Sequence, residues 1–480
     1  MSSNLIVLPK TKERPLSELL ESLPLFHSPD GDGYAMIEVN GHKETWPLNS
    51  IGFRHWLDFE FYEQNHRPLP TREVNQILGS LKARAQFGSP EIPVFTRLAF
   101  YNGSIYLDLC NAAWECIEIS ASGWRIDPDP PVRFLRSPGM LPLPHPRRGS
   151  SLEELKNFIN TPDLDTWIPC ISWALGTMNP KAPNPILNIE GGSGRAKTAS
   201  SHMIRALIDP SAAPLRPAPN TLRDLMIASK NSHIICLDNL STIPGWLSDA
   251  LCRLATGTGF VTRRLYTDTD EVIINTMRPI ILNGIDFLPD RPDFIDRSLV
   301  VSLPVIPDER RKPIEELWKG FEIARPGILG ALLDTTSFVL ANLDNVELKS
   351  YPRMADFAKW AISAESKIGL KPEEFLKLYE DNRRSAIEDS LERSIVASAV
   401  RDLFGPGSSS KTTATELLKK LEEQVSNNGG KIALLPKTPS QLSGILRRVQ
   451  GDLLSVGIEV LFEREPGTSK RFITIKCLNQ

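Results

Sequence analysis

The chain has 480 residues, of which 41% are hydrophobic and 24% charged, with a formal net charge of −3. This composition is typical of a globular protein of about two to four domains and excludes disordered and collagen-like classes. No stretch approaches the roughly 20 apolar residues that span a bilayer, and the apolar run at 5–8 is too short for a signal peptide. The six cysteines are scattered without a C-x-x-C pair, which predicts free thiols in a reducing, cytoplasmic compartment. Because the net charge is small, contacts with nucleic acid would have to come from local patches.

Residues 1–127 are expected to form an α+β accessory domain. Asn40-Gly41 and Asn102-Gly103 each lie between extended runs, and this dipeptide predicts a hairpin because both turn residues need positive φ. Residues 51–65 and 72–87 have helical patterns. The region shows no catalytic constellation. Residues 128–150 are rich in proline, which predicts an extended linker at the first domain boundary.

From residue 151 onward the pattern predicts an α/β fold. Four short apolar runs have the composition of buried strands, at 185–189, 234–237, 279–282 and 299–303. Helical segments or turns separate them, which favours a parallel sheet within a core domain at 151–305. Residues 306–385 are mostly helical in pattern and are interpreted as a helical lid on that core.

Residues 386–480 predict a separate C-terminal domain. Helices are expected at 388–403, from the capping-box pattern Thr413-Ala414-Thr415-Glu416 to about 427, and from Thr438 to about 454. Two strands follow at 458–463 and 471–475 around a Pro-Gly turn. Three helices followed by a two-stranded wing are the arrangement of a winged helix.

A glycine-rich segment between the first core strand and the next helix carries the strongest chemical signal. In such a strand–loop–helix context, backbone N–H groups and the helix N-terminus cradle phosphates. Lys197 would reach the β- and γ-phosphates of ATP, and Thr198 would bind Mg²⁺. Ala196 stands where the strict motif has glycine, so an ordinary glycine-rich turn is the alternative. The predicted nucleotide-binding residues are Gly191, Gly192, Ser193, Gly194, Arg195, Ala196, Lys197 and Thr198.

Polar residues at the ends of the other strands complete this predicted site. Asp238 ends an apolar strand and is placed to hold Mg²⁺; Asn239 follows where a glutamate is usual, so it can orient water but cannot take its proton. Asn283 ends the third strand and is expected between these two motifs, near the γ-phosphate. Arg297 precedes the fourth strand, where an arginine finger would act on a neighbouring subunit. Ordinary strand-end and ion-pair roles are the alternatives for Asp238 and Arg297.

Two groups of basic residues are candidate DNA contacts. The runs 264–267 and 271–274 predict a β-hairpin inserted before the third strand, with Arg263 and Arg264 at its base. On the predicted winged helix, the third helix carries Arg447 and Arg448, and the wing carries Lys470 and Arg471. A protein-docking module with solvated charges is an equal alternative for that domain.

The sequence resembles the AAA+ helicase-like ATPases of phages, plasmids and integrative elements, which are related to superfamily-3 and minichromosome-maintenance helicases and are often associated with a primase. The resemblance rests on 191–198, 207–210, 237–239, 251–257, 278–284, Asp296-Arg297 and 353–357. It implies ATP and Mg²⁺ as cofactors, a homo-oligomeric hexameric ring, and single-stranded or forked DNA and a primase as partners, with no membrane. It also implies a nucleotide-sensing lid arginine, for which Arg353 is the choice.

The expected activity is ATP-driven DNA unwinding in the replication of a mobile genetic element. Two alternatives stay open: a replication initiator that uses nucleotide as a switch without translocating, and a structural ring with a silent ATPase. The accessory domain at 1–127 is either a collar of the DNA channel or a docking site for a primase.

Overall fold

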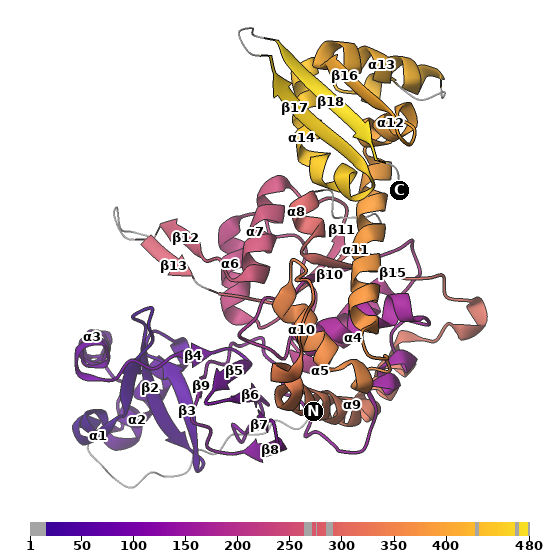
Figure 1. The fold of residues 1–480 in the computed structure, drawn as a ribbon. Coiled ribbons are helices and arrows are strands. Elements are labelled where there is room, and N and C mark those ends of the chain that lie inside the picture. Colours follow the sequence, from indigo (N-terminus) through magenta and orange to yellow (C-terminus); the bar gives the residue numbers. More distant parts are fainter. Residues whose placement is uncertain are drawn as a thin grey trace.

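The computed structural model describes residues 16–263, 271–274, 276–284, 291–427, 432–465 and 470–478. Figure 1 shows a central α/β body with an N-terminal module at one end and a C-terminal module at the other. The C-terminal module is carried on the long helix α11 (Glu374–Arg393). The mixed α/β architecture and the parallel central sheet confirm the predicted fold class at that level.

The N-terminal module is an antiparallel sheet of order β1-β2-β3 packed against helices. The predicted hairpin at Asn40-Gly41 is confirmed, since these residues have φ of 50° and 82° between β2 and β3. The two predicted helices are also present, and Ser50 caps the first through a 3.1 Å bond from the Phe53 amide. The elements are α1 (Leu16–Ser22), β1 (Leu25–His27), β2 (Gly33–Val39), β3 (His42–Pro47), α2 (Ile51–Asn65) and α3 (Thr71–Gly88).

A second antiparallel sheet, of order β5-β6-β7-β8, joins the central body. Its predicted turn at Asn102-Gly103 is confirmed, with φ of 47° and 84°. Its buried side chains, such as Leu107 and Ile117, share one hydrophobic core with α4 and α9. Residues 98–127 therefore pack as part of the body and not with the N-terminal module. The strands are β5 (Leu98–Tyr101), β6 (Ser104–Asp108), β7 (Cys116–Ser120) and β8 (Gly123–Asp127).

The proline-rich segment 128–150 is not a free linker. Within it β9 (Arg133–Phe134) pairs in parallel with β4 (Val94–Phe95), and Phe134 and Leu143 are buried. Arg136 forms a 2.6 Å ion pair with the buried Asp108. The segment is extended, as its composition predicts, but apolar side chains between the prolines anchor it to the body.

The central sheet has the order β11-β14-β10-β15, and all its pairs are parallel. Successive residues of a strand face opposite sides, so Leu187 packs with α4 and α5 whereas Ile186 packs with α6 and α7. The predicted strands are confirmed with small shifts of their ends. The elements are η1 (Leu152–Asn157), α4 (Leu164–Gly176), β10 (Ile186–Glu190), α5 (Lys197–Ile208), α6 (Leu222–Asn231), β11 (Ile235–Leu240), α7 (Gly245–Thr256), β14 (Ile280–Gly284), α8 (Pro292–Ile295) and β15 (Ser298–Ser302).

A β-hairpin projects from this body between α7 and β14 (Figure 1). Its described strands are β12 (Phe260–Arg263) and β13 (Glu271–Ile274); the predicted second strand at 271–274 is confirmed, and the predicted first strand at 264–267 lies outside the described residues. The register pairs Phe260 with Ile274 and Arg263 with Glu271. Arg263 is therefore at the far end of the described ladder and not at its base, which corrects the prediction; Arg264 lies outside the described residues.

The helical region after β15 contains η2 (Asp308–Arg310), α9 (Ile314–Asn342), η3 (Leu343–Asn345), α10 (Ala355–Ser363), η4 (Glu365–Lys367) and α11. Contrary to the expectation from the sequence, one helix, Ile314–Asn345, is long and apolar enough to cross a membrane by length and composition, but 61% of its apolar window is buried inside the fold. The contacts of α9 with α4, α5 and β7 make it a core helix of the body.

The C-terminal module combines three helices with an antiparallel sheet of order β16-β18-β17. The predicted helix at 388–403 is wrong: α11 runs through the expected boundary at 386, and a new helix begins after Ser394, which caps it. The capping box at Thr413 and Glu416 is confirmed. The sheet has a third strand, β16, that was not predicted. The elements are α12 (Ile395–Leu403), β16 (Ser409–Thr413), α13 (Ala414–Asn427), η5 (Ile432–Leu434), α14 (Pro439–Ser455), β17 (Ile458–Arg464) and β18 (Arg471–Cys477).

Candidate functional site

The glycine-rich loop, residues 191–196, connects the carboxyl end of β10 to the N-terminus of α5. Gly191 has φ of 137°, and a Cβ there would lie 2.8 Å from Cδ of Arg195. Gly194 has φ of 74°, also a conformation that favours glycine. Ala196 adopts a left-handed conformation, φ 63° and ψ 27°, directly before α5. The position where the strict motif has glycine thus keeps the backbone that glycine would provide.

Hydrogen bonds from neighbouring side chains hold the loop in place. Nζ of Lys197 donates to the carbonyl oxygens of Gly191 and Gly192 at 2.6 and 2.9 Å. Burial, and secondly the charge of Arg195, lower the pKa of Lys197 below its usual value, although Asp238 opposes them. Asn160, which sequence reasoning missed, donates through Nδ2 to the carbonyls of Arg195 and Pro304 at 3.2 and 2.8 Å. The loop is therefore held in its conformation by Lys197 and by the side-chain amide of Asn160, which lies in the segment before α4.

The structure brings together the polar residues predicted from the strand ends. Oγ1 of Thr198 lies 3.0 Å from Oδ1 of Asp238 on β11. Strand β14 lies between β10 and β11, which places Asn283 between the loop and Asp238, as expected. Nδ2 of Asn283 donates to Oγ of Ser201 at 3.1 Å, and its Oδ1 accepts the Asn239 amide at 2.9 Å. Asn239 has φ of 57° and lies at an irregularity of β11, where the register with β14 shifts between Leu237 and Leu240.

A cavity of about 460 Å³ opens over this loop. The predicted residues that line it are Ser193, Gly194, Arg195, Ala196, Lys197, Thr198, Asn239 and Asn283. Sequence reasoning missed four more lining residues: Ala199 and His202 on α5, the latter one turn after Thr198, and Ile314 and Trp318 from the first turns of α9. The i, i+4 spacing from Thr198 was the available signal for His202. Nothing in the sequence shows that α9 returns to the loop.

Two predicted arginines lie away from this cavity. Arg297 is at the amino end of β15, and its carbonyl accepts the Ile186 amide at the start of β10. The loop follows the other end of β10, roughly 15 Å away at about 3.3 Å per residue. Nη1 of Arg297 donates to the Asp293 carbonyl at 2.6 Å, while the carboxylate of Asp296 pairs with Arg383. The alternative role of Arg297, an ion pair with the carboxylate of Asp293 or Asp296, is therefore not observed.

The choice of Arg353 as the lid arginine is not supported by its position. Arg353 is exposed in the turn before α10 and is not among the described residues that line the cavity. Arg311 is a better-placed cation from the same helical region: its Nη2 lies 3.9 Å from the position that a Cβ of Gly194 would occupy. Its Nε forms a 3.2 Å ion pair with Asp308. The segment between β15 and α9, rather than the turn before α10, approaches the loop.

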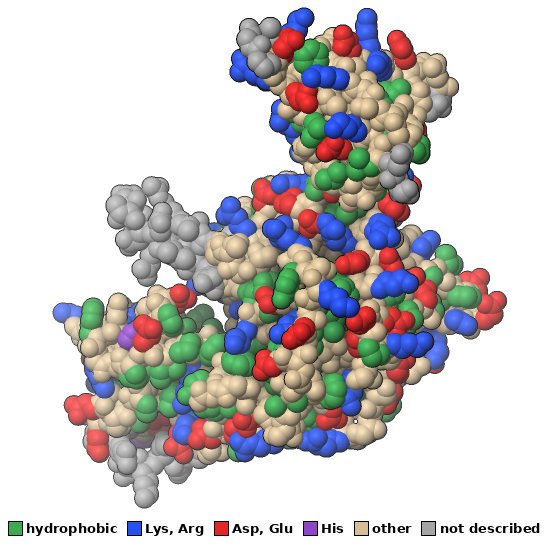
Figure 2. All heavy atoms as spheres, in the orientation of Figure 1, with side chains coloured by type: hydrophobic (Ala, Val, Ile, Leu, Met, Phe, Trp, Pro, Cys, Tyr) green, Lys and Arg blue, Asp and Glu red, His purple; other side chains and the backbone are tan. Residues whose placement is uncertain are grey.

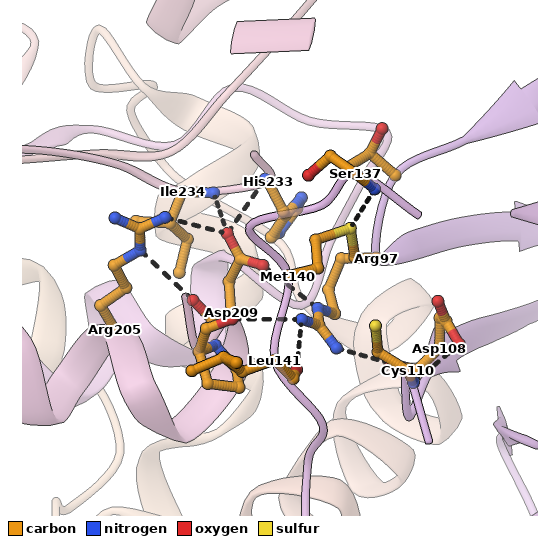
Figure 3. A network of polar contacts seen from close by, with 12 residues as sticks. Arg97, Asp108, Cys110, Ser137, Met140, Leu141, Arg205, Asp209, His233 and Ile234 are labelled. Atoms are coloured by element: carbon orange, nitrogen blue, oxygen red, sulfur yellow. Dashed lines mark hydrogen bonds and ion pairs between the residues drawn. The ribbon is translucent and has the colours of Figure 1, made fainter. Parts of the chain in front are cut away.

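A buried charge network lies behind the site, at the far end of α5 (Figure 3). Asp209 ends α5 and is 1% exposed; its Oδ1 accepts Nε of Arg97 at 3.1 Å, and Arg205 lies 3.7 Å from its Oδ2. The backbone amides of His233 and Ile234, directly before β11, both donate to Oδ2 at 3.0 Å. One carboxylate therefore ties together the helix that begins at Lys197, the strand that leads to Asp238, and the β5–β8 sheet.

The candidate DNA contacts on the C-terminal module are exposed. The guanidinium of Arg447 on α14 lies 4.0 Å from the ring centroid of Phe462 on β17, so this arginine connects the helix to the sheet. Arg471 pairs in register with Arg464, which sequence reasoning missed. Like charges directly opposite each other destabilise a sheet unless an anion lies between them. Arg448 and Lys470 are also exposed. Figure 2 shows both basic and acidic side chains on this module, as on the visible face of the body.

Solved structures of low sequence identity are similar to this chain. Apo structures of the NrS-1 C terminal region are similar at 13–14% identity with TM-scores of 0.38–0.41, covering 95–96% of this chain and 97–99% of those chains. A JCV helicase structure is similar at 11% identity with a TM-score of 0.22, covering 52% of this chain and 69% of that one. No curated protein sequence gives a significant match.

Two matches to family models cover most of the chain. The family described as the actinomycete integrative conjugative element replication protein matches residues 151–382, which contain the glycine-rich loop, Asp238, Asn283 and Arg297. The C-terminal domain of the same family, AICE RepA, matches residues 396–480. The chain therefore belongs to the family of actinomycete integrative conjugative element replication proteins.

Proposed function

We propose that this replication protein is a ring-forming AAA+ ATPase that uses ATP and Mg²⁺ to unwind DNA. The observation that carries the proposal is the 3.0 Å contact between Thr198 and Asp238. It joins a hydroxyl at the start of α5 to a carboxylate at the end of a buried strand, directly beside a glycine-rich loop. Oxygen ligands from a hydroxyl and a carboxylate suit Mg²⁺ that also binds nucleotide phosphates.

The residues around the cavity fit a nucleoside triphosphate. The loop amides and Lys197 would hold the phosphates, and exchanging its two carbonyl contacts for phosphate oxygens gives Lys197 stronger, charge-assisted bonds. Arg311 approaches the loop closely enough to exchange Asp308 for a phosphate. Asn239 and Asn283 would orient the attacking water, since their amides can donate and accept but not take a proton.

The first test is phosphate release with and without single-stranded DNA. Lys197→Ala should abolish release while leaving the fold intact, because it removes the cation that neutralises phosphate charge at the loop. Lys43→Ala is the matched control, because Lys43 is half-exposed and pairs with Asp129 on the N-terminal side of the chain. Turnover by Lys197→Ala equal to that of the control would refute the assignment of the site.

Subunit assembly is the second part of the proposal. Because Arg297 lies at the opposite end of β10 from its own loop, it is poorly placed to serve that loop and well placed to serve a neighbour's. Arg297→Ala should bind nucleotide but lose most hydrolysis. Mixing Arg297→Ala with Lys197→Ala protein creates interfaces with both residues intact, so partial recovery of activity is expected. Mixed oligomers shown by mass measurement without recovery would contradict action in trans.

We also propose that the C-terminal module is a winged helix that contacts DNA. The order helix, strand, two helices and two strands, with Arg447 spanning helix and wing, supports this assignment. Replacing Arg447 and Arg471 by glutamine should weaken DNA binding and reduce its salt dependence, because fewer counterions are released. The same change at exposed Arg72 and Lys82 of the N-terminal module is the control. An unchanged affinity and salt slope would favour protein docking instead.

A nucleotide switch that initiates replication without translocating is the second candidate. It is favoured by one observation: the described residues that line the cavity include no Asp or Glu side chain that could serve as a general base. Unwinding of a forked duplex with ATP distinguishes the two functions. A motor separates the strands in proportion to phosphate release, whereas a switch binds nucleotide and DNA without separating them. Nucleotide binding with neither activity would identify a silent ring.

A further inference from the structure

One side of the cavity over the glycine-rich loop is lined by aromatic and apolar side chains, which offer no cation for phosphate groups. His202, Ile314 and Trp318 line it together with the loop. The imidazole of His202 and the indole of Trp318 lie 4.4 Å apart between ring centroids, at an interplanar angle of 55°. Ile314 is 53% exposed although it lies in the first turn of α9, beside this indole. An apolar surface is thus held open next to a predicted phosphate site.

Helix α5 separates the two sides of the site. Ser201 faces β14, where its hydroxyl accepts a hydrogen bond from Asn283, whereas the next residue, His202, faces Trp318 on α9. The hydrolytic residues therefore lie on one flank of α5 and the aromatic surface lies on the other. Ala199, which also lines the cavity, lies between Thr198 and His202 along α5.

The indole of Trp318 is fixed from behind. Its ring meets that of the fully buried Phe321 edge to face, with centroids 5.4 Å apart at 86°. Phe321 in turn packs against Phe158, with centroids 5.6 Å apart. A tryptophan held in this way loses little side-chain entropy when a planar ligand packs on it.

His202 is suited to an uncharged environment. Burial, and then the charges of Arg205 and Arg325, lower its pKa below the usual value for histidine, against a weaker opposing effect of Glu322. The imidazole is consequently neutral at neutral pH and does not compete with Lys197 for phosphate. A neutral ring beside an indole offers an aromatic surface for a nucleobase.

We propose that His202, Ile314 and Trp318 form the nucleobase-binding platform of this site, which takes purine bases by stacking and apolar contact. The inference rests on the proposed nucleotide site and names which side of the cavity the base occupies. Among the described lining residues, the hydrogen-bonding groups on this side are the ring nitrogens of His202 and Trp318. Stacking on a ring face does not use them, so adenine and guanine nucleotides should bind with affinities within about tenfold.

The test compares full nucleotides with the phosphate chain alone. Calorimetry would measure binding of the Mg²⁺ complexes of β,γ-imido ATP, β,γ-imido GTP and inorganic tripolyphosphate to the full chain. Base stacking on an aromatic side chain corresponds to a loss of roughly 5- to 150-fold on truncation to alanine. Trp318→Ala should lose this factor for both nucleotides and keep the affinity for tripolyphosphate. Trp318→Phe should keep most of the nucleotide affinity, because it keeps a ring face.

Each outcome separates this inference from the function on which it rests. If Lys197→Ala loses tripolyphosphate and nucleotide binding while Trp318→Ala loses nucleotide binding alone, both proposals are supported. If Trp318→Ala leaves the affinity for both nucleotides unchanged, the platform is overturned while the phosphate site stands. The same conclusion follows if Trp318→Ala and Trp318→Phe weaken the binding of both nucleotides and of tripolyphosphate by the same factor. If wild-type protein binds neither tripolyphosphate nor nucleotide, the proposed nucleotide site itself is wrong. A difference between adenine and guanine far above tenfold would refute recognition by stacking.

Discussion

Replacing Asp209 by asparagine tests whether the buried charge network supports the site. The change keeps the shape of the side chain and removes its charge, so Arg97 and Arg205, which are 0% and 1% exposed, are left as buried cations without their counter-charge. The amide nitrogen of asparagine also cannot accept a backbone N–H. One of the bonds to Oδ1 or Oδ2, from Arg97 or from the amides of His233 and Ile234, is therefore lost (Figure 3).

The expected loss of stability is large. Breaking a buried ion pair by removing one partner costs about 3–5 kcal/mol. At about 2.1 cal/mol/K of unfolding entropy per residue, each kcal/mol lowers the melting temperature of a 480-residue chain by about 1 °C, so a decrease of roughly 3–5 °C is expected. Phosphate release should fall as well, because Asp209 joins the end of α5 to the start of β11, and these elements carry Lys197 and Asp238 at their other ends.

The pH dependence of this effect has a defined sign. Burial opposes ionisation of Asp209, but Arg97, Arg205, His233 and the Ile234 amide outweigh it and hold its pKa below the usual value. A carboxyl whose folded pKa is lowered contributes stability that is present above its unfolded pKa near 3.9 and is lost as the pH falls through the folded pKa. The difference between wild type and Asp209→Asn should thus be constant from pH 5 to 8 and shrink below pH 4.

Thermal unfolding of the full chain measures this prediction. Asp129→Asn is the matched control: the same substitution is made in a 2.9 Å pair with Lys43, but the two side chains are 63% and 52% exposed. An exposed pair contributes at most about 1 kcal/mol. If Asp209→Asn melts within about 1 °C of Asp129→Asn between pH 5 and 8, the network does not have the role that its burial implies.

Three further changes test particular features. Ala196→Gly removes the cost of about 1 kcal/mol of a left-handed alanine, but it also adds conformational entropy of similar size to the unfolded state. The two effects offset each other, so melting temperature and phosphate release should stay nearly unchanged. Ala196→Val should lower both. Arg311→Ala should weaken binding of a Mg²⁺–triphosphate several-fold, and Arg310→Ala, which changes its exposed neighbour, should not. Burial and then Asp296 raise the pKa of Asp452 to about 6, so this carboxyl favours folding below pH 4 and loses its contribution as the pH rises through 6. Asp452→Asn should therefore raise stability above pH 7 by up to about 3 kcal/mol and have no effect below pH 4; equal pH profiles would refute this.

Local chemistry explains which elements were predictable. Asn-Gly turns need positive φ at two successive residues, and Asn40, Gly41, Asn102 and Gly103 all have it. The capping box at Thr413 likewise depends on groups three residues apart. Strand β16 was missed because its sequence, Ser-Ser-Lys-Thr-Thr, has no apolar alternation; it exists because its backbone pairs with β18, more than fifty residues later. Such pairing is decided by tertiary contacts and not by propensity.

The same distinction explains the candidate site. Thr198, Asp238, Asn283 and Arg297 could be placed from the sequence because each adjoins a strand or the helix that follows one, and parallel strands align like ends at one edge. No such rule governs the path from β15 to α9. That path decides that Arg311, and not Arg353, approaches the loop, and that Trp318 reaches the cavity. Residues whose positions follow from strand direction were therefore predictable, whereas residues brought by a returning segment became visible only in the folded chain. Lys197 of the phosphate site belongs to the first group and Trp318 of the base platform to the second. Substitutions at these two residues therefore test two independent parts of one cavity.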